Sequence, residues 1–288
     1  MKTFLIRLLR LLLTTVKPKS GLAKFATNEV VRNAIRALPT PLVARLPGGL
    51  EIEVDPEDFN GRKLWLSGTN DWKITNTVID LLDRDDILLD IGANYGSVGL
   101  AAREKVGTQG HVHLFEPQPD LVRRMRATLD TAGADNVSLH EIALSDHDAE
   151  VELVLKGRHS GGASIVAHDA AGKTETIRVE ARKTRDFVAP LVGDKAFGVK
   201  IDVEGAEPLI LPDLLGFPTL KFVIFEGNQN VATLFDLLES HEFAIFGFCR
   251  TVLRTRVARV ADAQDRHRYH DFVAIRRDQA EGLVKRIH

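Results

Sequence analysis

The sequence predicts an α/β fold built on a mostly parallel sheet with helices on both faces. From residue 87 onward, apolar runs of strand length alternate with longer helical patterns, as in proteins with parallel sheets. The first run, 87–91, leads through a tight turn with two glycines into a helical pattern that begins at residue 96. At 288 residues, the chain is long enough for one large domain of this class with an appendage.

Seven strands are expected in this sheet. Each is a largely apolar run bounded by turn signals, which is typical of strands that are buried on both faces. The runs are 87–91, 112–115, 137–143, 197–203, 220–225, 243–248 and 271–275. Helical patterns lie between several of them, at 96–105, 119–129, 206–215 and 231–240.

A β insertion at about 149–196 separates the third strand from the fourth. Apolar and polar residues alternate at 151–155 and again at 177–181, which predicts a hairpin or two added strands. The stretch between them, 157–174, is rich in Gly, Ser and Ala and is expected to be a long loop. A loop of this length inside a compact domain is either functional or a plain connection. It is therefore interpreted as a lid or substrate wall, with a mobile link as the alternative.

Residues 1–60 are predicted to form a helical and β extension ahead of the main domain. A helical pattern covers 21–45. Residues 50–54 and 63–66 alternate like strands, and Asn60-Gly61 between them is a turn signal.

The first segment of this extension is amphipathic and basic. Residues 1–28 contain no acidic side chain, and one helical stripe is polar while the opposite side carries most of the leucines. Such a helix can lie on an anionic membrane, on the core of the protein or on a second subunit. Peripheral membrane contact through residues 1–17 and a homo-oligomer are therefore both candidates. The basic residues are Lys2, Arg7, Arg10, Lys17, Lys19 and Lys24.

Composition excludes several classes of function. A net charge of −2 gives no electrostatic case for nucleic acid as a partner. Cys249 is the only cysteine, so no intrachain disulfide can form, and a reducing, cytoplasmic location is expected. No apolar run approaches the roughly 20 residues that a bilayer crossing needs.

The turn after the first strand reads Asp90-Ile91-Gly92-Ala93-Asn94-Tyr95-Gly96. It differs from the dinucleotide fingerprint, which needs glycine at its first, third and sixth positions. Those positions hold Gly92, Asn94 and Ser97. A carboxylate at Asp90 suits a ligand with a positive charge or an amino group, which favours a cofactor other than NAD.

Two further strand ends face the same crevice. Glu116 ends the second strand, where a carboxylate can accept hydrogen bonds from a ribose diol, although an NAD enzyme also places an acid there. Ala143 and Leu144, at the end of the third strand, could flank an adenine ring, with backbone groups and Ser145 or Asp146 near its amino group.

Polar residues also alternate on the predicted central strand. Lys200, Asp202 and Glu204 are costly to bury unless they are paired or functional. Asp202 is the candidate general base, with His159 from the insertion as the second choice. A structural ion pair of Lys200 with either carboxylate is the alternative. No histidine lies close in sequence, and no metal is assigned.

Together these strings resemble the FkbM-type family of S-adenosylmethionine-dependent methyltransferases. The most specific string is Lys200-Ile201-Asp202-Val203-Glu204-Gly205. The resemblance implies a Rossmann-like class I methyltransferase domain over 61–288, with the last strands of the sheet reversed. It also implies methyl transfer to oxygen, often on sugars or polyketide-type products. It places Asp202 and Glu204 toward the acceptor, and on the cofactor side it places Asp90, Gly92, Asn94, Gly96, Glu116, Pro117, Ala143 and Ser145.

The expected acceptor is a hydroxylated small molecule or glycan, such as a sugar, a glycolipid or a secondary metabolite. Lys200, Glu226 and Asn228 are the candidate substrate-binding residues. Two alternatives stay open at this point. One is an NAD-dependent sugar-modifying enzyme, and the other is a non-catalytic module that binds cofactor and recruits a membrane.

Overall fold

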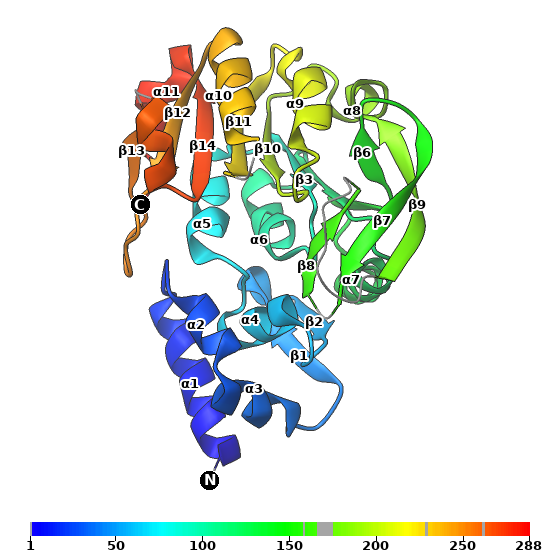
Figure 1. The fold of residues 1–288 in the computed structure, drawn as a ribbon, viewed down its shortest axis with the longest axis vertical. Coiled ribbons are helices and arrows are strands. Elements are labelled where there is room, and N and C mark those ends of the chain that lie inside the picture. The colour runs from blue at the N-terminus through cyan, green and yellow to red at the C-terminus, as the bar shows by residue number, and fades with distance from the viewer. Residues whose placement is uncertain (1, 158, 166–174, 228–229, 261–262) are drawn as a thin grey trace.

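The computed structural model describes residues 2–157, 159–165, 175–227, 230–260 and 263–288. Its centre is an eight-stranded sheet in the order β13-β12-β14-β11-β10-β3-β4-β5 (Figure 1). The strands are β3 (Ile87–Ile91), β4 (His111–Phe115), β5 (Val137–His140), β10 (Phe197–Ile201), β11 (Leu220–Glu226), β12 (Phe243–Phe248), β13 (Val257–Arg259) and β14 (Asp271–Arg276). The predicted α/β class with a mostly parallel sheet is confirmed.

The strand directions correct one expectation. The five strands from β5 to β11 are parallel, and β14 runs antiparallel between β11 and β12. Because β12 is antiparallel to β14, it has the same direction as β11, so only one of the last two predicted strands is reversed. The helix α10 (Val231–Ser240) provides the crossover that two parallel strands need. The eighth strand, β13, has only three residues, too few to give a pattern in the sequence.

Helices cover both faces of the sheet because both faces are apolar. Leu88 belongs to one buried cluster and its neighbour Leu89 to the other, as expected when successive side chains point to opposite faces. The remaining helices of this domain are α5 (Trp72–Leu81), α6 (Ser97–Val106), α7 (Pro119–Ala132), α8 (Thr184–Val192), α9 (Glu207–Leu215) and α11 (Arg277–Val284). None of the helices in the described part of the chain has the length and apolar composition that a bilayer crossing requires.

The N-terminal extension packs below the sheet as a small lobe (Figure 1). Its elements are α1 (Lys2–Val16), α2 (Leu22–Thr27), α3 (Glu29–Arg36), β1 (Leu42–Arg45), η1 (Pro47–Gly49), β2 (Glu51–Val54) and α4 (Phe59–Ser67). The strands β1 and β2 form an antiparallel pair. The helix expected over 21–45 is therefore two short helices followed by a strand. The division of the chain at residue 60 stays a prediction.

The strand predicted at 63–66 is wrong, because these residues lie in the helix α4. Asp58 caps this helix: its carboxylate accepts a 2.7 Å hydrogen bond from the Gly61 amide. Leu64, Trp65 and Leu66 are all buried, so their burial does not alternate as it would on a half-buried strand. The Asn60-Gly61 pair belongs to the first turn of the helix.

The insertion forms a second sheet in the order β6-β9-β7-β8. Its strands are β6 (Ala143–Ser145), β7 (Ala149–Lys156), β8 (His159–Ser164) and β9 (Glu175–Lys183). The two added strands are confirmed in β7 and β9. The predicted third strand, however, divides between β5 of the main sheet and β6 of the insertion. The predicted loop is also partly wrong, because β8 occupies 159–164 and packs against α4.

Candidate active site

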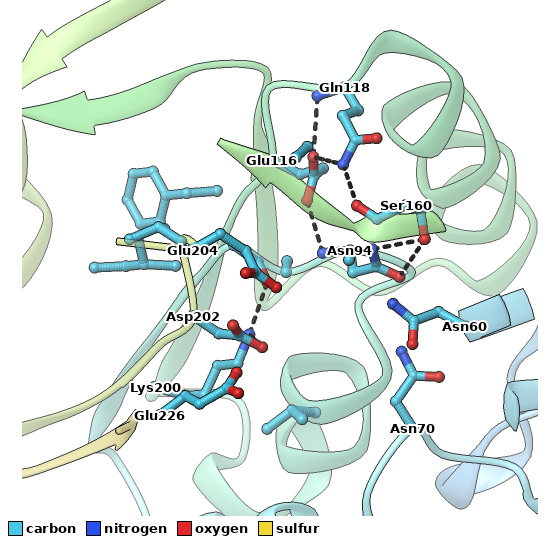
Figure 2. A pocket seen from close by; sticks show the side chains of 18 of the residues that line it. Asn60, Asn70, Asn94, Glu116, Gln118, Ser160, Lys200, Asp202, Glu204 and Glu226 are labelled. Atoms are coloured by element: carbon cyan, nitrogen blue, oxygen red, sulfur yellow. Dashed lines mark hydrogen bonds and ion pairs between the residues drawn. The ribbon is translucent and has the colours of Figure 1, made fainter. Parts of the chain in front are cut away.

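A cavity of about 500 Å³ lies at the carboxyl ends of β3, β4, β10 and β11. This is where open parallel sheets bind ligands, and the volume is in the usual range for small-molecule sites. Helix α4, the segment before α5, and strand β8 supply the opposite wall. The site therefore combines the sheet, the N-terminal lobe and the insertion. Figure 2 shows the polar side chains that point into it.

The turn after β3 lets the backbone approach the cavity closely. Gly92 has φ 72°, and a Cβ atom there would lie 1.9 Å from the carbonyl oxygen of Asp202. No side chain fits at that distance. Asn94 also has a positive φ of 55°, and both residues line the cavity. Gly96, with φ 69°, shapes the start of α6 and is absent from the lining.

Asp90 lies beneath this turn and does not line the cavity. Its side chain is fully buried; Oδ2 accepts a 2.9 Å hydrogen bond from the Gly99 amide, and Oδ1 lies 3.3 Å from Lys200 Nζ. Lys200 Nζ also donates a 2.7 Å hydrogen bond to the Gly92 carbonyl. Burial alone would lower the pKa of Lys200, but the charges of Asp90 and Asp202 outweigh it and raise the pKa. Lys200, paired with Asp90, thus holds the turn in place through the Gly92 carbonyl.

Glu116 is held by three donors. Oε2 accepts a 2.8 Å bond from the Asn94 amide, and Oε1 accepts bonds of 3.0 and 3.1 Å from the Gln118 amide and side chain (Figure 2). A carboxylate has about four lone-pair sites, so one site, on Oε2, remains for a ligand. Burial raises the pKa of Glu116 to about 7, although these hydrogen bonds oppose the increase.

Strand β8 is tied to this network by Ser160, a residue that the sequence analysis did not select. Its Oγ lies 2.9 Å from both Asn94 Nδ2 and Asp58 Oδ2, and its amide donates a 2.8 Å bond to Asp58 Oδ1. Its carbonyl accepts a 2.9 Å bond from the Gln118 side chain. One serine thus joins the insertion, the N-terminal lobe and the turn after β3. Only the helix-capping position of Asp58 could have indicated this contact beforehand.

The side of the cavity toward the insertion is apolar. Pro117 and Ala143 line it together with Ile142 and Leu144. Ser145 is buried behind this wall, where its Oγ bonds to Asp146 at 3.2 Å. The apolar wall suits an aromatic ring, whereas the Ser145 hydroxyl does not line the cavity.

The opposite end of the cavity is acidic. Asp202, Glu204 and Glu226 all line it, and one carboxylate oxygen from each lies within 4.8 Å of the others. Oxygen ligands so arranged are of the kind that divalent cations prefer. Burial, together with the charge of Asp202, raises the pKa of Glu226 to about 7. Of the other predicted residues, Asn228 lies outside the described residues.

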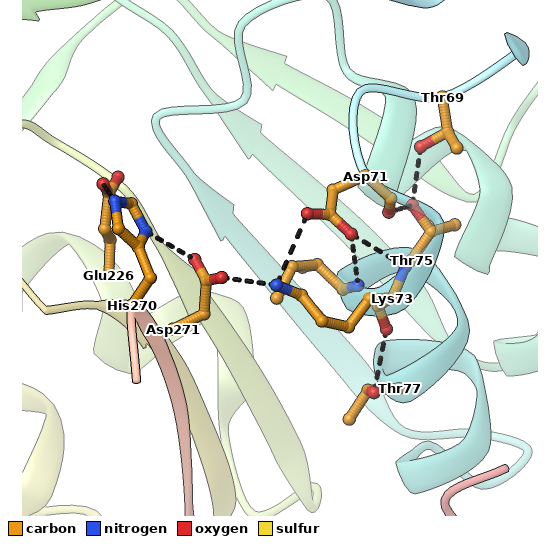
Figure 3. Close-up of polar contacts among 9 residues, drawn as sticks. Thr69, Asp71, Lys73, Thr75, Thr77, Glu226, His270 and Asp271 are labelled. Carbon is orange, nitrogen blue, oxygen red and sulfur yellow. Dashed lines mark hydrogen bonds and ion pairs between the residues drawn. The ribbon is translucent and has the colours of Figure 1, made fainter. Parts of the chain in front are cut away.

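A chain of polar contacts extends from Glu226 to His270 and Asp271, which also line the cavity (Figure 3). His270 Nε2 lies 3.2 Å from Glu226, and its Nδ1 lies 3.6 Å from Asp271. Asp271 in turn accepts a 2.5 Å hydrogen bond from Lys73 Nζ. The sequence analysis missed His270 and Asp271. Because β14 is reversed, its first residues lie beside the carboxyl end of β11, and that placement is the signal that could have found them.

His159 lines the cavity from β8. Its ring stacks on Phe59 with 5.0 Å between the ring centroids. The structure therefore brings every described candidate to the same region, with Asp90, Gly96 and Ser145 supporting the wall and the others lining the cavity.

One family model matches more than half of the chain. The family "Methyltransferase FkbM domain" matches residues 90–269. No curated protein sequence matches the chain.

Solved structures of methyltransferases are similar to the chain at low identity. Precorrin-6y C5,15-methyltransferase from Geobacter metallireducens is 14% identical, with a TM-score of 0.41, over 71% of this chain and 86% of its own. Methyltransferase FkbM from Methylobacillus flagellatus is 16% identical, with a TM-score of 0.42, over 68% and 44%. TrmK from M. capricolum, solved with S-adenosyl-homocysteine, is 12% identical, with a TM-score of 0.39, over 70% and 65%.

Proposed function

The chain belongs to the FkbM family of S-adenosylmethionine-dependent methyltransferases, and from this premise we propose that it methylates a hydroxyl group. The proposed acceptor is a sugar, a glycan or glycolipid, or a secondary metabolite. Family membership decides against the NAD-dependent alternative. The observation that carries the proposal is the acidic end of the cavity, where Asp202, Glu204 and Glu226 lie close together. These groups can bind several hydroxyls and take up a proton.

The cavity fits S-adenosylmethionine in shape and in charge. The bare backbone at Gly92 leaves room for a close approach, and Glu116 keeps one lone-pair site for a ribose hydroxyl. Three carboxylates at the other end together complement a sulfonium cation, and two of them remain when one is neutralised. We assign Gly92, Asn94 and Glu116 to direct cofactor contact, with Pro117 and Ala143 beside the adenine ring. Asp90, Gly96 and Ser145 are assigned to supporting this wall, because none of them lines the cavity.

Methyl transfer does not require the protein to form a covalent bond with either substrate. The bound cofactor supplies an activated methyl group, so the residues must align the acceptor, exclude water and remove one proton. We propose Asp202 as the group that accepts this proton. Its side chain is 44% exposed, so it can reach an acceptor in the cavity, and Lys200 Nζ lies 3.9 Å from its Oδ2. Glu204 and Lys200 would then orient the acceptor.

Glu226 and His159 are the competing bases. Glu226 has a pKa of about 7, which suits proton transfer near neutral pH. His159 lines the cavity but stacks on Phe59, so its ring is directed by an apolar contact. Separate Asp202→Asn and Glu226→Gln variants distinguish the first two, because only the loss of the true base lowers turnover without lowering cofactor affinity.

The experiment is transfer of a labelled methyl group into fractionated extract, with the product identified by mass. Asp202→Asn is expected to lower labelling at least about 100-fold while calorimetry shows unchanged cofactor binding. Asp130→Asn, an exposed change in α7, is the matched control and should keep full activity. Unchanged labelling by Asp202→Asn would remove the assignment of the base. Cofactor binding without transfer to any fraction would instead favour the non-catalytic module.

A further inference from the structure

Helix α1 has a wide apolar side, and only part of it packs against the rest of the protein. Ile6 and Leu13 are buried against the N-terminal lobe, and Leu9 packs beside them. The rest of the apolar side points outward. This outward set, which we call the α1 face, consists of Phe4, Leu5, Leu8, Leu11, Leu12 and Val16, exposed by 43–69%.

A second apolar tip lies at the end of the same helix. The connection between β12 and β13 exposes Val252 by 58% and Leu253 by 68%. It reaches down the side of the molecule toward the end of α1, where the Lys19 amide donates a 2.8 Å hydrogen bond to the Val252 carbonyl (Figure 1). Segments more than 230 positions apart in sequence thus contribute to one apolar region.

Exposed apolar side chains are concentrated here and not spread over the protein. Among the described residues, every large hydrophobic side chain with high exposure lies in the N-terminal lobe or in this connection. Single exposed leucines are common, but a contiguous apolar region marks an interaction site. The central domain, in contrast, covers its apolar surface.

The two segments that carry these apolar side chains are basic. No acidic residue occurs in 1–28, and exposed Arg7, Lys17 and Lys24 lie in that segment. The β12–β13 connection adds three exposed arginines, Arg250, Arg254 and Arg256, and has no acidic residue between 249 and 256. Leucines surrounded by basic side chains are the pattern of surfaces that lie on anionic lipid.

We propose that the α1 face and the Val252–Leu253 tip form a docking surface for an anionic lipid bilayer. The apolar side chains enter the boundary between headgroups and acyl chains, and the basic residues contact lipid phosphates. A second copy of the chain is the weaker occupant. A twofold contact would place the same basic surfaces against each other, and like charges would repel.

Vesicle sedimentation tests this surface without any need for turnover. The full chain is expected to sediment with vesicles of phosphatidylcholine containing about 30% phosphatidylglycerol, and much less with phosphatidylcholine alone. Leu8→Glu with Leu11→Glu should lower binding at least about tenfold, and Val252→Ser with Leu253→Ser should lower it by a smaller factor. Both pairs are exposed, so unchanged circular dichroism and cofactor binding are expected.

The matched control is Arg123→Gln with Arg126→Gln in α7, which changes the net charge by the same −2 away from the proposed surface. It should keep binding close to that of the unaltered chain. The proposal is overturned if the unaltered chain stays in the supernatant. It is also overturned if the Leu8/Leu11 variant binds vesicles as well as the unaltered chain, or if the α7 control loses as much binding as the Leu8/Leu11 variant. A dimer that the Leu8/Leu11 variant dissociates in sedimentation velocity would also overturn it in favour of a second copy.

Discussion

Lys200 Nζ lies 3.3 Å from Asp90 Oδ1 across the pairing of β10 with β3, and both side chains are buried. The same ammonium holds the Gly92 carbonyl. A fixed ion pair below the turn therefore links the central strand of the sheet to the loop that lines the cavity.

Removing one partner of this pair should lower the free energy of unfolding more than removing both charges does. Lys200→Met leaves Asp90 charged and unpaired in the core, with an expected loss of roughly 3–5 kcal/mol in the free energy of unfolding. Lys200→Met combined with Asp90→Asn should recover part of this loss. Urea denaturation measures both variants and Asp90→Asn alone. If the loss in the double variant equals the sum of the two single losses, the two charges are not coupled.

The tight approach at Gly92 gives a second prediction. Gly92→Ala forces a Cβ atom against the Asp202 carbonyl at a positive φ, so the turn must move. Unfolding free energy should fall by roughly 3 kcal/mol or more, and cofactor binding should be lost. Gly133→Ala is the matched control: φ is 57° there, but no atom lies within 4 Å of the new Cβ. It should cost only about 1 kcal/mol. Similar losses for both would contradict a steric role for Gly92.

The pKa of Glu116 predicts how cofactor affinity depends on pH. Burial raises this pKa to about 7, so the acid is half protonated near neutral pH. Only the carboxylate can accept from both a backbone amide and a ribose hydroxyl at Oε2. Affinity should therefore rise about tenfold between about pH 6 and about pH 8 in calorimetry. Glu116→Gln should abolish that difference, whereas Glu226→Gln should keep it. A steep profile that persists in Glu116→Gln would contradict the assignment.

The raised pKa of Glu116 also makes the stability of the fold fall with rising pH, whereas cofactor affinity rises. The native pKa of Glu116 exceeds its unfolded value, so the native state binds more protons. This residue's contribution to stability is fully present below about pH 4.5 and is lost as the pH rises through about 7. The difference in unfolding free energy between Glu116→Gln and the unaltered chain should thus change in that window and be constant outside it.

Ser160 gives a test of how the insertion supports the site. Ser160→Ala removes the bonds from its Oγ to Asn94 and Asp58 but keeps those made by its backbone. Cofactor affinity should fall about 3- to 10-fold, in line with about 1 kcal/mol for a hydrogen bond. Ser138→Ala, on β5 outside the cavity, is the control and should leave affinity unchanged. Full affinity in Ser160→Ala would show that the Oγ bonds do not position Asn94.

Local patterns determined much of this fold. The apolar runs at β3, β10 and β11 are long, continuous and bounded by turns, so a parallel sheet was predictable from them. The order of acidic residues and glycines from Asp90 to Gly96, followed by Glu116, was sufficient to predict a ligand site at the carboxyl ends of the strands, where the cavity lies. These signals are local because strand ends and tight turns are specified within a few residues.

Where the local sequence suited more than one secondary structure, tertiary contacts decided which one formed. The segment 63–66 has a period that suits a strand, but burial on all sides of α4 makes it a helix. The stretch at 159–164 has little apolar character, and it is a strand because β7 pairs with it and Ser160 bonds to the N-terminal lobe.

The same is true of the site. Asp90 was expected to face the cofactor, yet the pairing of β3 with β10 places it against Lys200 beneath the turn. His270 and Asp271 reach the acidic end of the cavity only because β14 is reversed in the sheet. The sequence by itself determined the family, the cofactor and the strand ends, since these depend on short motifs. Only the tertiary structure decided which carboxylates face the cavity and which leucines of α1 stay exposed, because both depend on contacts between segments far apart in the chain.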